Sequence, residues 1–452
     1  MKKFWATILT IVITFFLILA TSNFLSYDKR GSAKYNDYYQ HAENYDILFL
    51  GSSHALMGVL PTELWQEYQI SSYNLSNYGQ WLSVDYWMLQ AALQRHTPKL
   101  VVLDTFSINV DEKYSDSNLV YLHDTFDHYK YPILKYKAAA DLFPSNLKAD
   151  FLFPFSLYHS NWDSVSANYF LPYEKLYFFD GGSDPNASYG ATNAPTFISP
   201  QTIDTALNFH SKSVTPQTTG KHYLRKIIEL CKKNDIQILL TTIPFAPASE
   251  FQIQWANSIE DIAKEYNINY YNGLSENIIN YNTDMYDAGH LNSLGAQKWS
   301  CELGKYICQQ YDIPVYESGK VYDYWNTYLT EKSIPHKIEA LKSQTNLYNY
   351  LLLATDESFS VNFYVDSTAT LSQDTVFLDL INNLLISDLY ENFSYNVKIG
   401  EPYYDISYDI IYHDYYNINK SYPQNFNLLI EITDSATGDI IDVAAFWDYQ
   451  KL

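Results

Sequence analysis

The apolar residues of the chain gather in short continuous runs, and segments of helical periodicity separate these runs. Uninterrupted apolar runs of about four to eight residues are typical of strands buried on both faces of a parallel sheet. Apolar residues at spacings of three and four predict amphipathic helices between the runs. We expect strands at residues 47–50, 70–75, 100–104, 236–243 and 268–271, and helices at residues 55–65, 81–93, 222–233, 251–266 and 296–309. Strands that alternate with helices in this way predict an α/β domain with a parallel sheet.

The alternation breaks between about residues 110 and 220. A stretch this long without regular pattern is typical of a functional or lid-like segment. We therefore expect an insertion over the carboxyl edge of the sheet. It contains an aromatic run at residues 150–164, in which His159 and Trp162 have two interpretations: they line a substrate pocket, or they belong to a packed aromatic cluster.

The pattern changes again after residue 314. A helix-like linker leads to alternating apolar and polar runs at residues 359–365, 393–397, 406–413 and 426–432, separated by turn residues. Such runs predict strands of a separate β-rich domain. The expected domains are residues 1–26, 27–314 and 315–452.

The first of these segments is almost wholly apolar. Residues 4–25 carry no charged side chain, and about twenty apolar residues are enough to cross a bilayer as a helix. We expect an uncleaved transmembrane anchor at residues 1–26, followed by a polar, Tyr-rich spacer at residues 27–45.

Charge and cysteine content exclude several classes of protein. The 452 residues carry a formal net charge of −22, which argues against a nucleic-acid binder because phosphate contacts need clustered Lys and Arg. The three cysteines form no pattern typical of a metal site. Cys301 and Cys308 are seven residues apart on an expected helix, too far for a disulfide, and we expect both in the core. We expect no metal and no other cofactor.

Candidate chemistry lies where the first strand ends. Gly51, Ser52, Ser53 and His54 follow that strand directly, at the edge where open α/β sheets carry out chemistry. A serine there needs a base to take its proton and a carboxylate to orient the base. Far along the chain, Asp287 and His290 stand three residues apart in one polar loop. One loop can therefore present both partners to Ser53, whereas His54 points elsewhere on the turn and is a poor candidate for the base.

These blocks resemble those of the SGNH (GDSL-like) hydrolase superfamily. Ser53 stands in the nucleophile position, with Ser52 where Asp is usual, and Asp287-Ala288-Gly289-His290 resembles the closing Asp-x-x-His block. The resemblance implies a flavodoxin-like three-layer fold and the triad Ser53, Asp287 and His290. It also implies that the backbone N–H of Gly79, at the end of the block at residues 74–79, helps to bind an oxyanion.

One block of the superfamily is missing. The expected Gly-x-Asn-Asp sequence is absent after the third strand, so its side-chain oxyanion donor has no counterpart. Thr105 or Asn109 are substitutes by position, and His159 is a further candidate for substrate binding.

The resemblance is greatest to extracytoplasmic members related to the D-alanyl-lipoteichoic acid transfer protein and to polysaccharide O-acetyltransferases. It implies a serine acyltransferase or esterase, anchored by a single helix in the cell membrane, with its globular domains outside. The expected partners are an acyl donor, an envelope glycan or teichoic-acid-like acceptor, and a multipass membrane acyltransferase. The alternative is a non-catalytic surface-assembly protein that keeps the fold and binds glycan or a partner, which the missing block favours.

Overall fold

The computed structural model describes most of the chain. The described residues are 2–25, 29–128, 130–152, 158, 160, 162, 189–192, 198–204, 206–214, 217–354, 358–365, 395–399, 428–447 and 449–451. The expected strand at residues 406–413 and the candidate His159 lie outside them.

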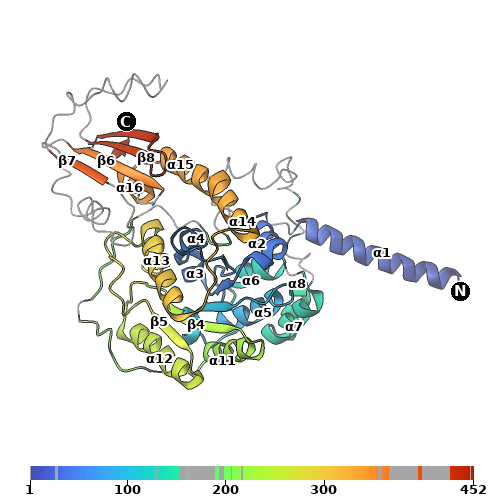
Figure 1. Cartoon of the computed structure of the whole chain (residues 1–452). Coiled ribbons are helices and arrows are strands. Elements are labelled where there is room, and N and C mark those ends of the chain that lie inside the picture. The colour runs from blue at the N-terminus through green and yellow to red at the C-terminus, as the bar shows by residue number, and fades with distance from the viewer. Residues whose placement is uncertain are drawn as a thin grey trace.

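A five-stranded parallel sheet forms the first part of the molecule (Figure 1). Its strands are β1 (Ile47–Leu50), β2 (Ser72–Asn74), β3 (Leu100–Asp104), β4 (Gln237–Thr242) and β5 (Asn269–Asn272). Every strand pair is parallel, and the order is β2-β1-β3-β4-β5. This is the order of flavodoxin-like doubly wound sheets, so the expected α/β architecture is confirmed. The chain adds β2 on one side of β1 and then β3, β4 and β5 on the other side. Ligands bind in such folds at the carboxyl edge of the sheet where this change of side occurs.

Alternate residues of each strand face two separate apolar layers. Leu48 and Leu50 of β1 belong to the core cluster that also contains residues of α5 (Leu82–Ala92), α11 (Thr219–Lys233) and α12 (Glu250–Tyr266). Ile47 and Phe49 belong to the cluster with α3 (Ser53–Gly58), α4 (Pro61–Tyr68) and α13 (Ser293–Gln310). Helices therefore cover both faces of the sheet, and the continuous apolar runs in the sequence reflect burial on both sides.

The helix expected at residues 55–65 is two helices. Pro61 is the first residue of α4, where its missing N–H costs nothing, and Leu60 before it is extended. The break leaves α3 as a short helix directly after β1, so that Ser53 is its first residue.

Residues 27–45 do not form a spacer. They include α2 (Lys29–His41) and the short 3₁₀ helix η1 (Ala42–Asn44), and Tyr35, Tyr38 and Tyr45 are buried in the first core cluster. Three tyrosines on one side of a polar segment allow that segment to pack, because each ring contributes a large apolar area.

The N-terminal helix α1 (Lys2–Leu25) lies at one end of the molecule (Figure 1). A membrane crossing needs about twenty consecutive apolar residues, and within the described residues no helix is found to be long and apolar enough to cross a membrane. The expected transmembrane anchor at residues 1–26, and with it the single-pass membrane localisation, is therefore wrong.

The segment between β3 and α11 begins with regular structure, which extends to residue 152. A short 3₁₀ helix, η2 (Phe106–Asn109), is followed by α6 (Leu119–Phe126), α7 (Pro132–Leu142) and α8 (Ser145–Leu152). Phe151 of the aromatic run is buried against Phe143 and His123, with ring centroids 4.2 and 4.6 Å apart, whereas Trp162 is exposed. Phe151 is thus part of a packed aromatic cluster, whereas neither interpretation of His159 and Trp162 is tested.

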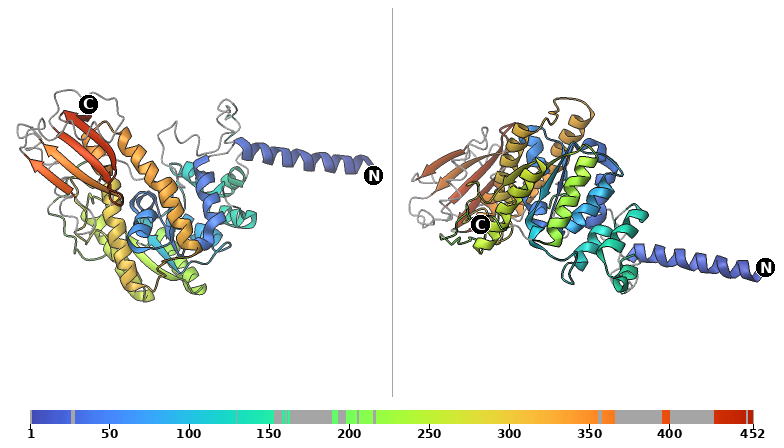
Figure 2. Two further views of the ribbon diagram at one scale, coloured as in Figure 1. Left: turned by 45° about the horizontal axis from the view of Figure 1, so that its top comes forward. Right: turned by 90° about the horizontal axis from the view of Figure 1, so that it is seen from below.

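The C-terminal part contains a second five-stranded sheet in the order β10-β9-β8-β6-β7. The connecting helices are α14 (Lys320–Tyr328), the π-helical turn η6 (Leu329–Ser333), α15 (Ile334–Ser343) and α16 (Leu347–Ala354). The strands are β6 (Phe359–Val365), β7 (Tyr395–Ile399), β8 (Leu428–Asp434), β9 (Ile440–Trp447) and β10 (Gln450–Lys451). Figure 2 shows this sheet and α1 at opposite ends of the molecule. The exact domain bounds stay a prediction.

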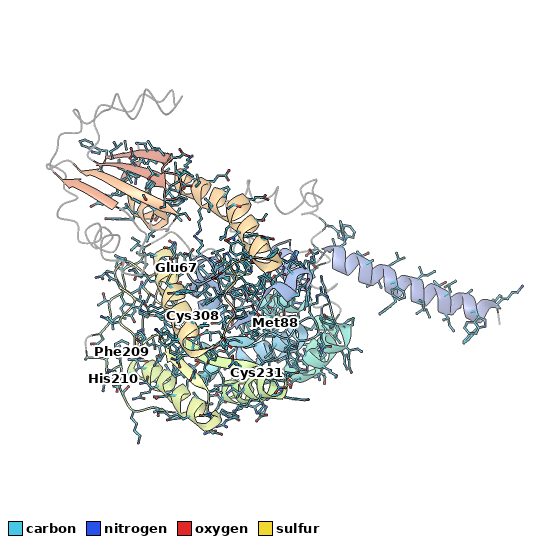
Figure 3. The ribbon with its side chains drawn as sticks, in the orientation of Figure 1. Glu67, Met88, Phe209, His210, Cys231 and Cys308 are labelled. Carbon is cyan, nitrogen blue, oxygen red and sulfur yellow. The ribbon has the colours of Figure 1, made fainter. Side chains whose placement is uncertain are left out.

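The cysteines are single thiols. Cys231 of α11 and Cys308 of α13 lie on different helices (Figure 3), and all three cysteines are free. Cys231 and Cys301 are buried as expected, but Cys308 is exposed because the last turn of α13 extends beyond the core. No group of His, Cys, Asp or Glu suited to a metal ion is found in the described part of the chain.

Candidate active site

Ser53 lies at the turn between β1 and α3, and Gly51 makes this turn possible. Gly51 has φ +150°, and a Cβ there would lie 2.6 Å from Cβ of Asp104 and 3.2 Å from Cβ of Ala55. The side chain of Ser52 caps α3 by accepting a hydrogen bond from the N–H of His54. The Ser53 N–H is therefore among the first amides of α3, which have no acceptor within the helix.

His290 reaches Ser53 from a loop 237 residues further along the chain. Nε2 of His290 lies 2.8 Å from Oγ of Ser53, and Nδ1 lies 2.8 Å from Oδ1 and 3.0 Å from Oδ2 of Asp287. Ser53 is half-buried and Asp287 is half-exposed. A serine, a histidine and a carboxylate thus form one hydrogen-bonded chain, which is the arrangement that activates a serine nucleophile.

Backbone contacts hold Asp287 and His290 in register within their loop. Oδ1 of Asp287 accepts hydrogen bonds from the N–H groups of Gly289 and His290, at 2.7 and 2.9 Å. The N–H of Tyr286 donates to the carbonyl of His290 at 2.9 Å. One carboxylate therefore both shapes the turn and orients the imidazole, which explains the spacing of three residues.

A buried ion pair anchors the start of the same loop. Both oxygens of Asp284 accept hydrogen bonds from Nζ of Lys298 on α13, at 3.0 and 2.9 Å. Asp284 is fully buried, and it also accepts hydrogen bonds from the N–H of Asn280 and the hydroxyl of Thr283. The carbonyl of Asp284 accepts from the N–H of Asn292, so both ends of the loop are tied together.

His54 lies beside the triad and was missed by the sequence reasoning, which placed it elsewhere on the turn. Its ring stacks on Phe106 with centroids 3.6 Å apart, and its centroid lies 5.1 Å from that of His290. His54 is buried, and burial together with the nearby His290 lowers its pKa well below the usual value. Its Nδ1 has no hydrogen-bond partner among the described residues. His54 is therefore an uncharged residue beside the triad. His290, whose Nε2 contacts Oγ of Ser53, has the contact expected of a base.

Two buried carboxyl groups lie beneath the nucleophile turn. Oδ2 of Asp104 accepts a hydrogen bond from the hydroxyl of Ser52 at 3.3 Å, and burial raises the pKa of Asp104 to about 7. Asp85 accepts a hydrogen bond from the side-chain amide of Gln80 at 2.7 Å, and burial raises its pKa well above the usual range. The only sequence signal for Asp104 was its position at the end of β3.

The residues expected to bind an oxyanion or the substrate are not brought together as the three triad residues are. Gly79 has φ +58° and packs beside Tyr121, and its role stays a prediction. Thr105 is fully buried, and its hydroxyl donates to the carbonyl of Thr241 at 2.9 Å, so it is already engaged. Asn109 is exposed at the end of η2.

Comparisons with known proteins give a likeness in solved structures only. No protein-family model and no curated protein matches the chain. The chain is similar to a structure described as a GDSL-like lipase from Bacteroides thetaiotaomicron, at 12% identity and a TM-score of 0.30, covering 62% of this chain and 100% of the other. It is also similar to a "putative acylhydrolase" from Bacteroides fragilis, at 12% identity and a TM-score of 0.31, covering 61% of this chain and 95% of the other. At these values the likeness carries no argument by itself.

The class follows from the molecule's own geometry: a Ser–His–Asp triad at the carboxyl edge of a doubly wound parallel sheet is the arrangement of a serine hydrolase. The sequence blocks resemble the SGNH (GDSL-like) hydrolase superfamily, and membership of that superfamily stays a prediction. The narrower relatives expected within that superfamily stay a prediction.

Proposed function

We propose that the protein is a serine-dependent enzyme that cleaves or transfers an acyl group carried as an ester. The observation that carries this proposal is the contact between Oγ of Ser53 and Nε2 of His290 at 2.8 Å, with Asp287 on the opposite ring nitrogen. A hydroxyl in this position loses its proton to the imidazole as it attacks a carbonyl carbon.

The chemistry would proceed in two balanced steps. Ser53 Oγ forms a bond to the acyl carbon while its proton passes to Nε2 of His290, and the departing alcohol oxygen takes that proton when its bond to the acyl carbon breaks. In the second step the oxygen of water or of another hydroxyl attacks the acyl carbon while His290 takes its proton, and Ser53 Oγ receives that proton as its bond to the acyl carbon breaks. Asp287 holds the imidazole tautomer, and the N–H of Ser53 supports the negative oxygen of the intermediate.

The finer proposal concerns the substrate. We propose an O-acylated polysaccharide or a related envelope polymer as the acyl carrier or acceptor, which is the substrate class implied by the resemblance. Whether water or a polymer hydroxyl accepts the acyl group decides between an esterase and a transferase. A membrane acyltransferase as partner stays a prediction.

The test is covalent labelling with a fluorophosphonate, followed by peptide mass mapping. Wild-type protein should be labelled at Ser53, and Ser53→Ala should abolish labelling and the release of acetate from an activated acetyl ester. Thermal unfolding of Ser53→Ala should stay close to wild type, because a half-buried hydroxyl contributes little packing energy. The matched control is Ser52→Ala, which removes the neighbouring hydroxyl. Equal labelling of wild type and Ser53→Ala would move the nucleophile to Ser52 or elsewhere, and no labelling of either protein would favour the non-catalytic alternative.

A further inference from the structure

A polar pocket of about 540 Å³ is lined in part by the residues that precede the loop carrying Asp287 and His290. Residues 277–282, which follow β5, form one wall, and residues 201–203 form the other. Lys298 of α13 completes the lining. The N–H of Gln201 donates to the carbonyl of Tyr281 at 2.8 Å and joins the two walls. The volume lies within the range of about 300 to 1,000 Å³ that is usual for small-molecule sites.

The lining offers hydrogen-bonding groups that the protein itself does not use. The side chains of Thr202, Asn277 and Asn282 are exposed, and none of them makes a hydrogen bond to another described residue. The hydroxyl of Tyr281 likewise has no partner in the described part of the chain. Amides and hydroxyls each donate and accept, so these groups match a ligand that presents donors and acceptors side by side.

Charge in the lining argues against an anionic ligand. Lys298 is the one charged side chain of the lining, and it is buried with both oxygens of Asp284 within 3.0 Å of its Nζ. A phosphate or carboxylate group would need a free cation or a set of converging N–H groups to replace its water. The formal net charge of −22 also repels an anionic polymer.

Apolar surface completes the match to a sugar. Ile203, Ile278 and the ring of Tyr281 lie among the polar groups of the lining. A pyranose ring presents hydroxyl groups around its edge and C–H groups on its faces, so a mixture of amides, hydroxyls and aliphatic or aromatic surface is complementary to it.

We propose that this pocket binds neutral sugar residues of a polysaccharide and thereby holds that polymer beside the triad. The inference rests on the proposed function, because it identifies the polymer of that reaction as a neutral glycan rather than a phosphate-bearing one. Asp284 connects the two sites: it accepts the N–H of Asn280 from the pocket wall at 2.8 Å, and its carbonyl accepts the N–H of Asn292 beyond His290 at 3.0 Å. The wall of the pocket is therefore tied by hydrogen bonds to the loop that positions the base.

The experiment measures binding by titration calorimetry to the full chain carrying Ser53→Ala, so that no probe is turned over. The probes are hexasaccharides of glucose, of galactose and of N-acetylglucosamine, and the anionic comparators are a hexasaccharide of galacturonate and poly(glycerol phosphate). At least one neutral probe should bind with saturation, and neither anionic comparator should bind as tightly. Asn277→Ala and Asn282→Ala should each weaken binding by about 5-fold, and the double variant by about 20-fold, as expected for the loss of one hydrogen bond each.

Gln94→Ala is the matched control, since Gln94 is an exposed amide at the end of α5. It should leave affinity unchanged, and thermal unfolding should show that all variants keep the fold. Absence of binding by every neutral probe, equal affinity of the control and the pocket variants, or tighter binding of an anionic comparator would each overturn the proposal. Because the measurement uses an inactive protein, failure of the acyl chemistry would not affect its result.

Discussion

At the scale of single residues, the site pairs an active imidazole with an inert one. His54 is buried, stacks on Phe106, and has a pKa well below the usual value because burial and the nearby His290 disfavour its charged form. Its ring therefore stays neutral at pH values where an ordinary imidazole is already protonated. Removing a buried nitrogen that lacks a partner releases its desolvation cost, which is about 1 to 3 kcal/mol for a polar group.

His54→Phe is consequently expected to be neutral or to raise the free energy of unfolding by up to about 2 kcal/mol, because the stack on Phe106 is kept. The acid limb of kcat/KM against pH should be the same in both proteins, since the lowered pKa of His54 keeps its ring neutral. The measurements are denaturant unfolding and the pH profile with an activated acetyl ester. A fall in kcat of more than about 100-fold with intact folding would instead assign His54 a direct catalytic part.

Asp104 predicts how stability changes with pH. Its pKa is raised to about 7 by burial, so the folded state holds a proton that the unfolded chain has already lost between about pH 4 and 7. This contribution to stability is complete below about pH 4 and is lost as pH rises through about 7. The side chain of Asp104→Asn stays neutral at every pH. The free energy of unfolding of the variant minus that of wild type should therefore be roughly 2 to 4 kcal/mol larger at pH 8 than at pH 4.

Denaturant titrations of both proteins at several pH values measure this difference. Asn can still accept the hydrogen bond from Ser52, and Asp111→Asn, at a carboxylate that contacts Thr219 on the surface, is the matched control. A stability difference that is constant from pH 4 to 8 would show that Asp104 does not titrate there.

The residues that the sequence could predict are those whose chemistry shows in local order. Ser53 follows a buried strand, and Asp287 and His290 share one loop. Right-handed crossovers bring both segments to the same edge of a parallel sheet, so their meeting could be predicted. His54, Asp85 and Asp104 could not be predicted, because their character comes from neighbours far along the chain, such as His290 beside His54. Because the expected oxyanion block is missing, Thr105 and Asn109 were chosen only by their position after the third strand. The hydroxyl of Thr105 already donates to the carbonyl of Thr241, so position in the sequence alone does not identify an oxyanion donor.

At the scale of elements, the loop that carries Asp287 and His290 depends on its attachment to α13. Breaking a buried ion pair by removing one partner leaves an uncompensated charge and costs about 3 to 5 kcal/mol, whereas replacing both partners is far milder. Lys298 and Asp284 are both buried, so this rule applies to them. The base should therefore lose its position when the attachment fails.

Lys298→Met is expected to lower the free energy of unfolding by about 3 to 5 kcal/mol and to reduce kcat on an activated ester by about 10-fold or more, because Asp284 no longer fixes the loop. Adding Asp284→Asn should restore part of the stability. Lys305→Met, on the same helix with an exposed side chain near Glu302, is the matched control. The idea fails if Lys298→Met behaves like Lys305→Met in both unfolding and turnover.

Element prediction succeeded where periodicity was strong and failed where tertiary packing decided. The expected strand at residues 100–104 has the same bounds as β3. The helix expected at residues 222–233 is α11, which begins about one turn earlier. Residues 27–45 looked polar, but buried tyrosines turn them into a packed helix. The apolar run at residues 4–25 was interpreted by composition alone, and none of the described helices is long and apolar enough to span a membrane.

At the scale of the whole molecule, the two sheets are joined by helices that belong to different cores. Trp325 of α14 is fully buried in the first core cluster, stacked on Trp65 with centroids 5.0 Å apart, and it also contacts Tyr189 at 3.7 Å. In contrast, Leu347 and Leu351 of α16 belong to the cluster of the second sheet. A division at residue 314 would therefore cut through the first core, and we predict that the physical boundary lies after α14.

The position of Trp325 predicts how two truncated chains differ in thermal stability. A chain ending at residue 314 loses Trp325 and leaves a cavity against Trp65, whereas a chain ending at residue 333 keeps α14 and the buried Leu329. Loss of a buried Trp costs about 3 to 5 kcal/mol, which corresponds to a fall in melting temperature of roughly 10 °C. The measurement is thermal unfolding of both truncated proteins, with fluorophosphonate labelling of Ser53 as a probe of the site. Trp325→Ala in the longer chain is the matched control and should account for much of the difference. Equal melting temperatures for the two truncated proteins would mean that α14 contributes nothing to the first core, and the boundary at residue 314 would then stand.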